Sequence, residues 1–241
     1  MTPQPDYTRL RRFWRRHRGE EALLLCNGPS LRQVEFARID RSRFRVFGLN
    51  KIFLGFDLLG WEPDYLVAVN AKVLRQSLPV YAALRMPKFV SNRLALDQLP
   101  EDPLTYYMRT TPVPAGAGRF STDVVQYVRE GWTVTHAALQ LIHYMAFTRV
   151  FIVGMDHRFT RHVPGQENAS GVMTGDDTDH FHPAYFGGGQ AWDYPDLRNS
   201  EISYRAAREV FEASGRSIID CTQGGACDVF DKADISVLYT A

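Results

Sequence analysis

The segment Ala22-Leu23-Leu24-Leu25-Cys26 runs directly into Asn27-Gly28-Pro29-Ser30-Leu31. An unbroken apolar run followed by turn residues predicts a buried strand that ends in a sharp turn opening a helix. Gly28 lets the backbone approach a ligand, Pro29 stiffens the turn, and Ser30 can cap a helix that begins near Leu31. Ligands of open α/β sheets bind at the carboxyl ends of strands. The turn is therefore a candidate nucleotide site to which Asn27 brings its amide, and an ordinary strand–loop–helix connection is the alternative.

Short apolar runs alternate with helix-length amphipathic stretches along the rest of the chain. This alternation predicts an α/β fold of Rossmann-like type, a mostly parallel sheet with helices on both faces. The clearest unit is a helix followed by a strand that ends in Gly154-Met155-Asp156, which places Asp156 at a carboxyl end of the sheet. The predicted strands are 21–26, 44–49, 64–69, 87–91, 104–109, 149–154 and 216–221, and the predicted helices are 5–18, 31–37, 71–84, 121–130, 134–147 and 197–214.

With 241 residues, of which 45% are apolar, the chain suits a single domain with a sizeable core. We expect a basic N-terminal helix within 1–19, a nucleotide-binding catalytic domain over 20–231 and a C-terminal tail over 232–241. Residues 157–196 show no regular pattern and are rich in His, Gly, Asp and aromatic residues. Long irregular segments inside compact domains are usually functional, so we expect an active-site loop there.

Several protein classes are excluded by what the sequence lacks. No apolar run approaches the ~20 residues of a transmembrane helix and no signal-peptide core is present, so we expect a cytoplasmic protein. Three cysteines without a CxxC pair argue against a disulfide framework or a zinc site. P-loop, GxGxxG and GxSxG motifs are missing, which argues against P-loop phosphotransferases, nicotinamide enzymes and α/β-hydrolases. No nucleic-acid partner is expected, because no readout motif is present.

The net charge of +1 hides a strongly basic N-terminus. Residues 1–19 carry six arginines and one aspartate, or +5, which leaves −4 for the rest of the chain. Leu10, Phe13, Trp14 and His17 recur among the arginines at roughly helical spacing. Residues 5–18 are therefore a candidate basic amphipathic helix that contacts anionic lipid at the inner membrane, or another polyanion. The alternative is a solvated first helix that packs Leu10 and Trp14 on the body.

Polar residues follow several predicted strands or open a helix. Asn27, Asn50 and Asn70 end three strands, and parallel strands would bring their amides to the same edge of the sheet. Carboxamides there suit a neutral ligand rich in hydrogen bonds, such as a pyrimidine ribonucleotide, although asparagine is also common in turns. Thr133 and Thr135 begin the helix over 134–147, where free amides attract phosphate or carboxylate. An N-cap role for Thr133 is the structural alternative.

Two patches of the expected loop carry titratable groups. Arg158 and Arg161, with His157 and His162, can neutralise a leaving phosphate, and a solvated basic loop is the alternative. In the second patch, His180 or His182 can take a proton from a hydroxyl nucleophile while an acidic neighbour orients the ring. The other use of this patch is a divalent cation site formed by Asp176, Asp177 and Asp179, which ranks below the base.

These motifs resemble a known family. The Asn27–Leu31 turn after its strand, the strand end Phe47–Asn50 and the block from Gly131 to Asp156 resemble the MptE-like proteins, which are named for 6-hydroxymethylpterin pyrophosphokinase. Asp179–Phe181, Tyr185–Gly187 and Gly215–Gly225 fit the compact bacterial members. The same order is similar, more distantly, to the bacterial family-42 sialyltransferases, which use CMP-activated nonulosonic acids. The resemblance covers about residues 20–231.

The likeness to the sialyltransferases implies roles for the motif residues. It implies that Asn27, Asn50 and Asn70 contact a CMP donor and that Thr133 and Thr135 lie near its phosphate or carboxylate. It also implies that a histidine of the late loop, His180 or His182, is the general base of an inverting transfer without an obligatory metal. Those enzymes place tyrosines after the Gly-x-Asp motif, whereas this chain has Arg158 and Arg161.

We therefore expect a glycosyltransferase that moves a sugar from a nucleotide-activated, CMP-linked donor to a glycan or glycolipid in cell-surface assembly. Asn27, Gly28, Ser30, Asn50 and Asn70 would bind the donor, with Asp156 at the catalytic centre. The alternative is an ATP- and Mg²⁺-dependent pyrophosphokinase acting on 6-hydroxymethylpterin, with Asp156, Asp176, Asp177 and Asp179 as ligands. A nucleotide-binding scaffold without activity is a third interpretation, and homo-oligomer formation is left open.

Overall fold

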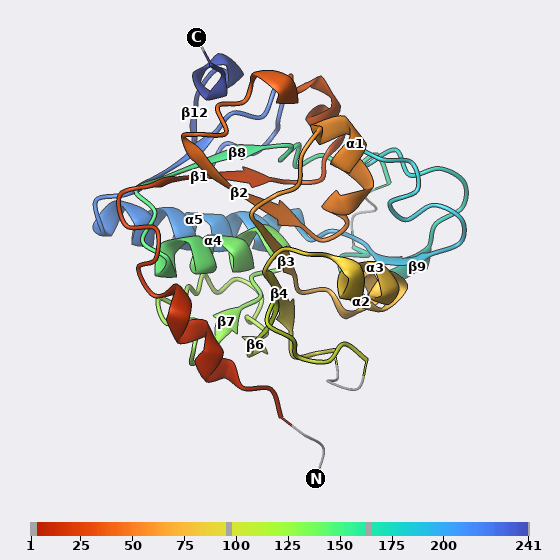
Figure 1. Ribbon diagram of the computed structural model, residues 1–241. Helices are drawn as coiled ribbons and strands as arrows, with labels where there is room; N and C mark the ends of the chain where they lie inside the picture. The colour runs from red at the N-terminus through yellow and green to blue at the C-terminus, as the bar shows by residue number, and fades with distance from the viewer. Residues whose placement is uncertain (1–3, 95–97, 162–164, 241) are drawn as a thin grey trace.

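The central element of the computed structural model is one sheet of eight strands (Figure 1), and residues 4–94, 98–161 and 165–240 are described. Every neighbouring pair of strands is parallel. The predicted α/β, Rossmann-like fold is confirmed. In sheet order the strands are β12 (Asp231–Lys232), β11 (Ser217–Asp220), β8 (Arg149–Val153), β1 (Glu21–Leu25), β2 (Phe44–Leu49), β3 (Tyr65–Ala68), β4 (Lys88–Ser91) and β5 (Thr105–Met108).

Helices cover both faces of this sheet, as predicted. The 3₁₀ helix η1 (Tyr7–Phe13) packs with α4 (Val134–Tyr144) and α5 (Leu197–Ala213) over one face. The other face is covered by short helices around α2 (Ala71–Gln76) and α3 (Leu78–Ala83). The remaining short helices are η2 (Pro29–Gln33), η3 (Phe36–Arg38), η4 (Ile52–Gly55), α1 (Phe56–Leu59) and η5 (Ile235–Leu238). None of the helices in the described ranges is long and apolar enough to cross a membrane.

All seven predicted strands belong to the sheet, but several predicted helices differ from the structure. Residues 121–130 form turns that end in β7 (Val128–Arg129), because Asp123 accepts hydrogen bonds from the amide of Val125 and the side chain of Gln126. The predicted helix over 71–84 breaks at Ser77, because Pro79 has no N–H to continue the helical hydrogen bonds and instead lies in the first turn of α3. The helix over 31–37 is replaced by η2 and η3, and 5–18 by η1 and turns.

Two minor strand pairings and the structure of the C-terminus were not predicted. β7 pairs with β6 (Thr110–Thr111), and β9 (Ser170–Val172) pairs with β10 (Ala191–Asp193) inside the predicted active-site loop. The expected tail over 232–241 begins in β12 and contains η5. These strands have two or three residues each, too few for a periodic signal.

The strand order changes direction between β1 and β8. From β1 the chain builds outward through β2, β3, β4 and β5, and then returns through α4 to β8 on the other side of β1. The carboxyl ends of these two strands lie close, because the amide of Gly28 donates to the carbonyl of Gly154 at 2.8 Å. A reversal of this kind opens a crevice at the carboxyl edge of the sheet, where ligands of α/β proteins bind.

Candidate active site

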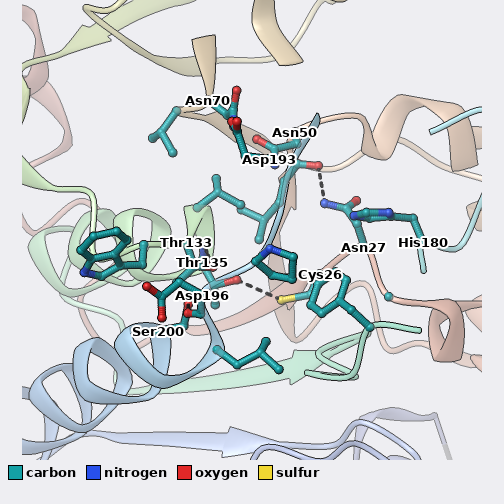
Figure 2. Close-up of a pocket in the computed structure, with 18 of the residues that line it drawn as sticks. Cys26, Asn27, Asn50, Asn70, Thr133, Thr135, His180, Asp193, Asp196 and Ser200 are labelled. Carbon is teal, nitrogen blue, oxygen red and sulfur yellow. Dashed lines mark hydrogen bonds between the residues drawn. The ribbon is translucent and has the colours of Figure 1, made fainter. Parts of the chain in front are cut away.

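A cavity of about 690 Å³ lies in this crevice, a size that suits a nucleotide-sized ligand. The carboxyl ends of β1, β2, β3 and β8 form its floor, and the first turns of α4 and α5 form a wall (Figure 2). Of the site residues predicted from the sequence, the cavity is lined by Asn27, Gly28, Asn50, Asn70, Thr133, Thr135, Asp156, Arg158, Asp179 and His180. The predicted residues outside its lining are Ser30, Arg161, Asp176, Asp177 and His182.

Two asparagines present unsatisfied oxygens. The Asn27 side chain donates from Nδ2 to the carbonyl of Leu49 at 3.1 Å, but its Oδ1 is buried without a donor among the described residues. Oδ1 of Asn50 is in the same state, and the backbone of Asn50 is left-handed with φ 47°. A buried acceptor without a donor costs about 1–3 kcal/mol. A ligand with N–H or O–H groups would remove that cost.

Asn70 lines the same cavity but is already satisfied. It caps α2, where its Oδ1 accepts from the amides of Lys72 at 2.8 Å and Val73 at 3.3 Å. Its Nδ2 donates to Asp193 at 3.2 Å, which ties α2 to β10. The ordinary turn interpretation therefore describes Asn70 better than a donor-binding one.

The opening turn binds the chain's own carboxylate. The amide of Ser30 donates to Asp156 at 3.1 Å, and its hydroxyl donates to the same carboxylate at 2.6 Å. The predicted cap by Ser30 is absent, because η2 begins at Pro29 after Gly28 and has no side-chain cap. Asp156 takes the position at this helix N-terminus where an anion would bind. Asn27 thus lines the cavity and keeps a side-chain oxygen without a donor among the described residues.

Gly28 is required by the approach of β8 to the turn. A Cβ on Gly28 would lie 2.0 Å from Oδ2 of Asp156 and 2.7 Å from the carbonyl of Gly154. We expect Gly28→Ala to lower the free energy of unfolding by about 1–3 kcal/mol, measured by urea denaturation. Gly118→Ala, whose Cβ would meet its nearest atom at 3.1 Å, is the control and should cost less. Equal stability of the two variants would contradict this packing argument.

The first turn of α4 faces the cavity. Two left-handed residues, Gly131 at φ 59° and Trp132 at φ 66°, turn the chain into the helix. Thr133 caps it, accepting from the amide of Thr135 at 3.3 Å, and also accepts from the hydroxyl of Tyr204 at 3.3 Å. Thr133 therefore fits both of its interpretations, an N-cap and a cavity residue. The free amides of this eleven-residue helix favour a negative group here.

The clearest candidate for acid–base chemistry is a histidine held by a buried carboxylate. His180 Nδ1 lies 2.8 Å from Oδ2 of Asp177, whose side chain is fully buried. Burial favours the neutral form of Asp177, but hydrogen bonds from His180 and from the amides of Asp179 and Phe186 outweigh it and hold its pKa below the ordinary value. An ionised Asp177 keeps the proton on Nδ1 and leaves Nε2 as an acceptor.

The His180 ring is fixed in place and faces the cavity. It stacks on Tyr185 with 4.0 Å between ring centroids and an interplanar angle of 2°. The neighbouring amide of Phe181 donates to the carbonyl of Asn27 at 2.9 Å, which joins the loop to the end of β1. Figure 2 shows the His180 ring beside the Asn27 side chain. His182 instead accepts from the amide of Ala184 with Nδ1, away from the cavity. Of the two predicted bases, His180 is therefore the one in position.

A second histidine of the cavity, His157, is also paired with a carboxylate, that of Glu201 outside the lining. His157 Nε2 is 3.2 Å from Glu201, and burial lowers the pKa of His157 while Glu201 opposes that effect. Glu201 is partly exposed and also pairs with Arg205 at 2.9 Å. This carboxylate is thus shared and less firmly held than Asp177. His162 of the same patch lies outside the described residues.

The three acidic residues considered for a divalent cation do not form a ligand set. Asp177 orients His180, and Asp179 accepts from the amide and hydroxyl of Thr160, each at 2.7 Å. Asp176 is exposed on the loop. No three His, Cys, Asp or Glu side chains in the described parts of the chain are grouped to hold a metal ion.

The two arginines that follow β8, Arg158 and Arg161, lie in different places. Arg158 lines the cavity, and its guanidinium donates only weakly to the carbonyl of Gly224 at 3.5 Å. Arg161 turns outward, donating to the backbone of Asp176 at 3.2 Å. Arg158 is therefore the one of this pair that can meet a phosphate in the cavity.

Lys51 is a residue that the sequence motifs did not single out. It is only 2% exposed, and its ammonium donates to the carbonyl of Tyr185 at 2.6 Å and to the side chains of Gln76 at 2.9 Å and Gln190 at 2.5 Å. Burial lowers the pKa of Lys51 to about 8, with Asp177 opposing the shift. Lys51 follows Asn50 directly, so a charged residue just after a strand end is the sequence feature that indicates a role at the site. Lys51 fixes the backbone of the residue on which His180 stacks.

The comparisons add no relative. No protein-family model matches the chain, and searches of curated proteins and of solved structures found no match. The resemblance to MptE-like proteins and family-42 sialyltransferases stays a prediction from the motifs.

Proposed function

We propose that the protein is an inverting glycosyltransferase that uses a nucleotide-activated sugar, with CMP as the expected carrier, in the cytoplasm. A glycan or glycolipid of cell-surface assembly would supply the acceptor hydroxyl. The observation that supports this best is the Asp177–His180 pair, which presents Nε2 to a nucleotide-sized cavity. A positioned histidine next to an ionised carboxylate is the arrangement that general-base catalysis requires.

In the proposed reaction, the oxygen of the acceptor hydroxyl attacks the anomeric carbon of the donor sugar while Nε2 of His180 takes the proton of that hydroxyl. The bond from that carbon to the phosphate oxygen breaks, and the nucleotide leaves with the electron pair. Asp177 stabilises the imidazolium that forms. Arg158 and the amides at the start of α4 are available to stabilise the charge that develops on the phosphate. A single displacement of this kind inverts the anomeric configuration.

The donor would be recognised through hydrogen-bond donors. Oδ1 of Asn27 and Oδ1 of Asn50 are acceptors without partners among the described residues, so they fit the amine of cytosine or ribose hydroxyls. Neither position offers a charge, which suits the neutral nucleoside part of the donor and leaves the phosphate to the cationic and amide groups.

The first test is thermal unfolding with CMP, CDP, UDP and ATP, each with and without Mg²⁺. We expect CMP to stabilise the protein without metal, by about 2.7 kcal/mol at a hundred times its Kd. Asn27→Ala should weaken this effect, whereas the same change at exposed Gln33 should leave it unchanged. An ATP response that requires Mg²⁺, with none to CMP, would contradict the transferase proposal and favour the pyrophosphokinase.

A further inference from the structure

The N-terminal segment exposes a strongly basic surface. Trp14 is 57% exposed, the largest exposed fraction of any tryptophan in the described chain, and arginines flank it on both sides. Apolar residues on the opposite side of the segment, Leu10 and Phe13, are buried in the core. We call the exposed side the basic N-terminal surface; it consists of Arg11, Arg12, Trp14, Arg15, Arg16 and Arg18.

This surface is held firmly on the domain. Phe13 packs edge-on against Tyr106 with 4.9 Å between ring centroids. His17 hydrogen-bonds the hydroxyl of Tyr65 at 2.7 Å, and its amide donates to the carbonyl of Met145 at 2.9 Å. Trp14 lies against Tyr144 at 4.9 Å between centroids. The arginines therefore project from a fixed platform.

The charge of the surface is not neutralised. None of its arginines forms an ion pair with a carboxylate in the described ranges, unlike Arg9 with Glu101 and Arg45 with Glu20. The one side-chain hydrogen bond of Arg12 within the described residues goes to the hydroxyl of Tyr106, at 2.9 Å. Arg216 adds a further cation close to Arg15. Because residues 1–19 carry +5 and the rest of the chain −4, the molecule has a positive end.

We propose that the basic N-terminal surface docks the protein on an anionic lipid bilayer. Exposed arginines are attracted to the negative surface potential of anionic lipids, and an exposed indole fits the headgroup region. A planar bilayer meets only this end of the molecule, so the negatively charged remainder stays away from it. The rest of the chain carries a net −4, so a nucleic-acid strand that extends beyond this surface finds no further net attraction there.

The surface and the cavity lie at opposite ends of α4. Tyr144 and Met145 at the C-terminal end of the helix accept hydrogen bonds from Arg15 and His17, whereas Thr133 and Thr135 at its other end line the cavity. Eleven residues of α-helix span roughly 16 Å. In Figure 1 the N-terminal segment passes α4 and enters the start of β1. Docking through this surface would thus keep the bilayer at the end of α4 away from the cavity residues Thr133 and Thr135, and the inference stands independently of the proposed reaction.

The test is co-sedimentation of the full chain with phosphatidylcholine vesicles that contain none or about 30% phosphatidylglycerol, at low and high salt. Binding should require the anionic lipid and weaken as the salt concentration rises. The tryptophan fluorescence should shift to the blue on binding, and Trp14→Phe should remove this shift.

Arg11, Arg15 and Arg18 make no side-chain hydrogen bond within the described chain, so R11Q/R15Q/R18Q should fold normally and bind roughly a hundredfold more weakly. The control R38Q/R198Q/R205Q removes the same charge from exposed positions elsewhere and should bind within about twofold of wild type.

The outcomes separate the alternatives. Binding to neutral vesicles, equal losses in both triple variants, or no binding to anionic vesicles would overturn the proposal. A wild-type protein that ignores vesicles but binds polyuridylate through Arg11, Arg15 and Arg18 would identify the surface as a nucleic-acid site instead. Circular dichroism and thermal unfolding of the variants check that a loss of binding is not a loss of fold.

Discussion

His180→Ala is expected to lower kcat by about 10²–10⁴-fold while leaving nucleotide binding intact. The reason is geometric, because Nδ1 is committed to Asp177 and the Nε2 side of the ring faces the cavity. Removal of the ring takes away the proton acceptor without touching Asn27 or Asn50. The measurement is release of CMP from a CMP-linked sugar in the presence of an acceptor, with CMP affinity measured in parallel by thermal shift.

Three further variants make this expectation specific. His182→Ala should retain activity within about twofold, because His182 lies outside the cavity lining. Asp177→Asn should lose much of the activity with the ring still present, since an amide no longer fixes the Nδ1–H tautomer. His157→Gln tests the competing pair with Glu201. If it abolishes turnover while His180→Ala does not, the base is assigned to the wrong histidine.

The sheet could be predicted because its signal is local. Runs such as Ala22–Cys26 and Val150–Val153 are apolar throughout, as strands buried on both faces require. The helix over 121–130 could not be excluded locally, since Asp123 stabilises a turn there through its own side chain. The N-terminal segment is likewise held by contacts distant in sequence, of Phe13 with Tyr106 and of His17 with Tyr65.

For the candidate site, the positions of residues could be predicted from the sequence, but their hydrogen-bond partners could not. Topology brings strand ends together, so the sequence predicted that Asn27, Asn50 and Asn70 share one edge, and all three line the cavity. Which atoms stay free depends on partners distant in sequence. The side chain of Asn70 is hydrogen-bonded to the first turn of α2 and to Asp193, whereas Oδ1 of Asn27 has no donor among the described residues. Contacts of this kind, like the burial of Lys51, carry no periodic signal.

The second large expected effect is the contribution of Lys51 to the pH dependence of the free energy of unfolding. Its pKa in the folded protein is about 8, and the ordinary value is 10.5, so the unfolded chain binds more protons between these pH values. The free energy of unfolding contributed by Lys51 therefore rises with pH across this window, by about 3 kcal/mol in total. Below pH 8 the residue is charged in both states, and the cost of burying that charge is fully present.

The measurement is urea denaturation of wild type, Lys51→Met and Lys51→Arg from pH 7 to pH 10. Other groups, such as the buried thiols of Cys26 and Cys221 with pKa values raised to about 12, also titrate on unfolding, so only differences between variants are informative. As the pH rises, the free energy of unfolding of wild type should increase relative to that of Lys51→Met, whose side chain does not titrate. It should increase by the same amount relative to Lys51→Arg, which stays charged throughout. A difference that does not change with pH would mean that Lys51 keeps its proton in the folded state, and that its three acceptors, the carbonyl of Tyr185 included, outweigh its burial.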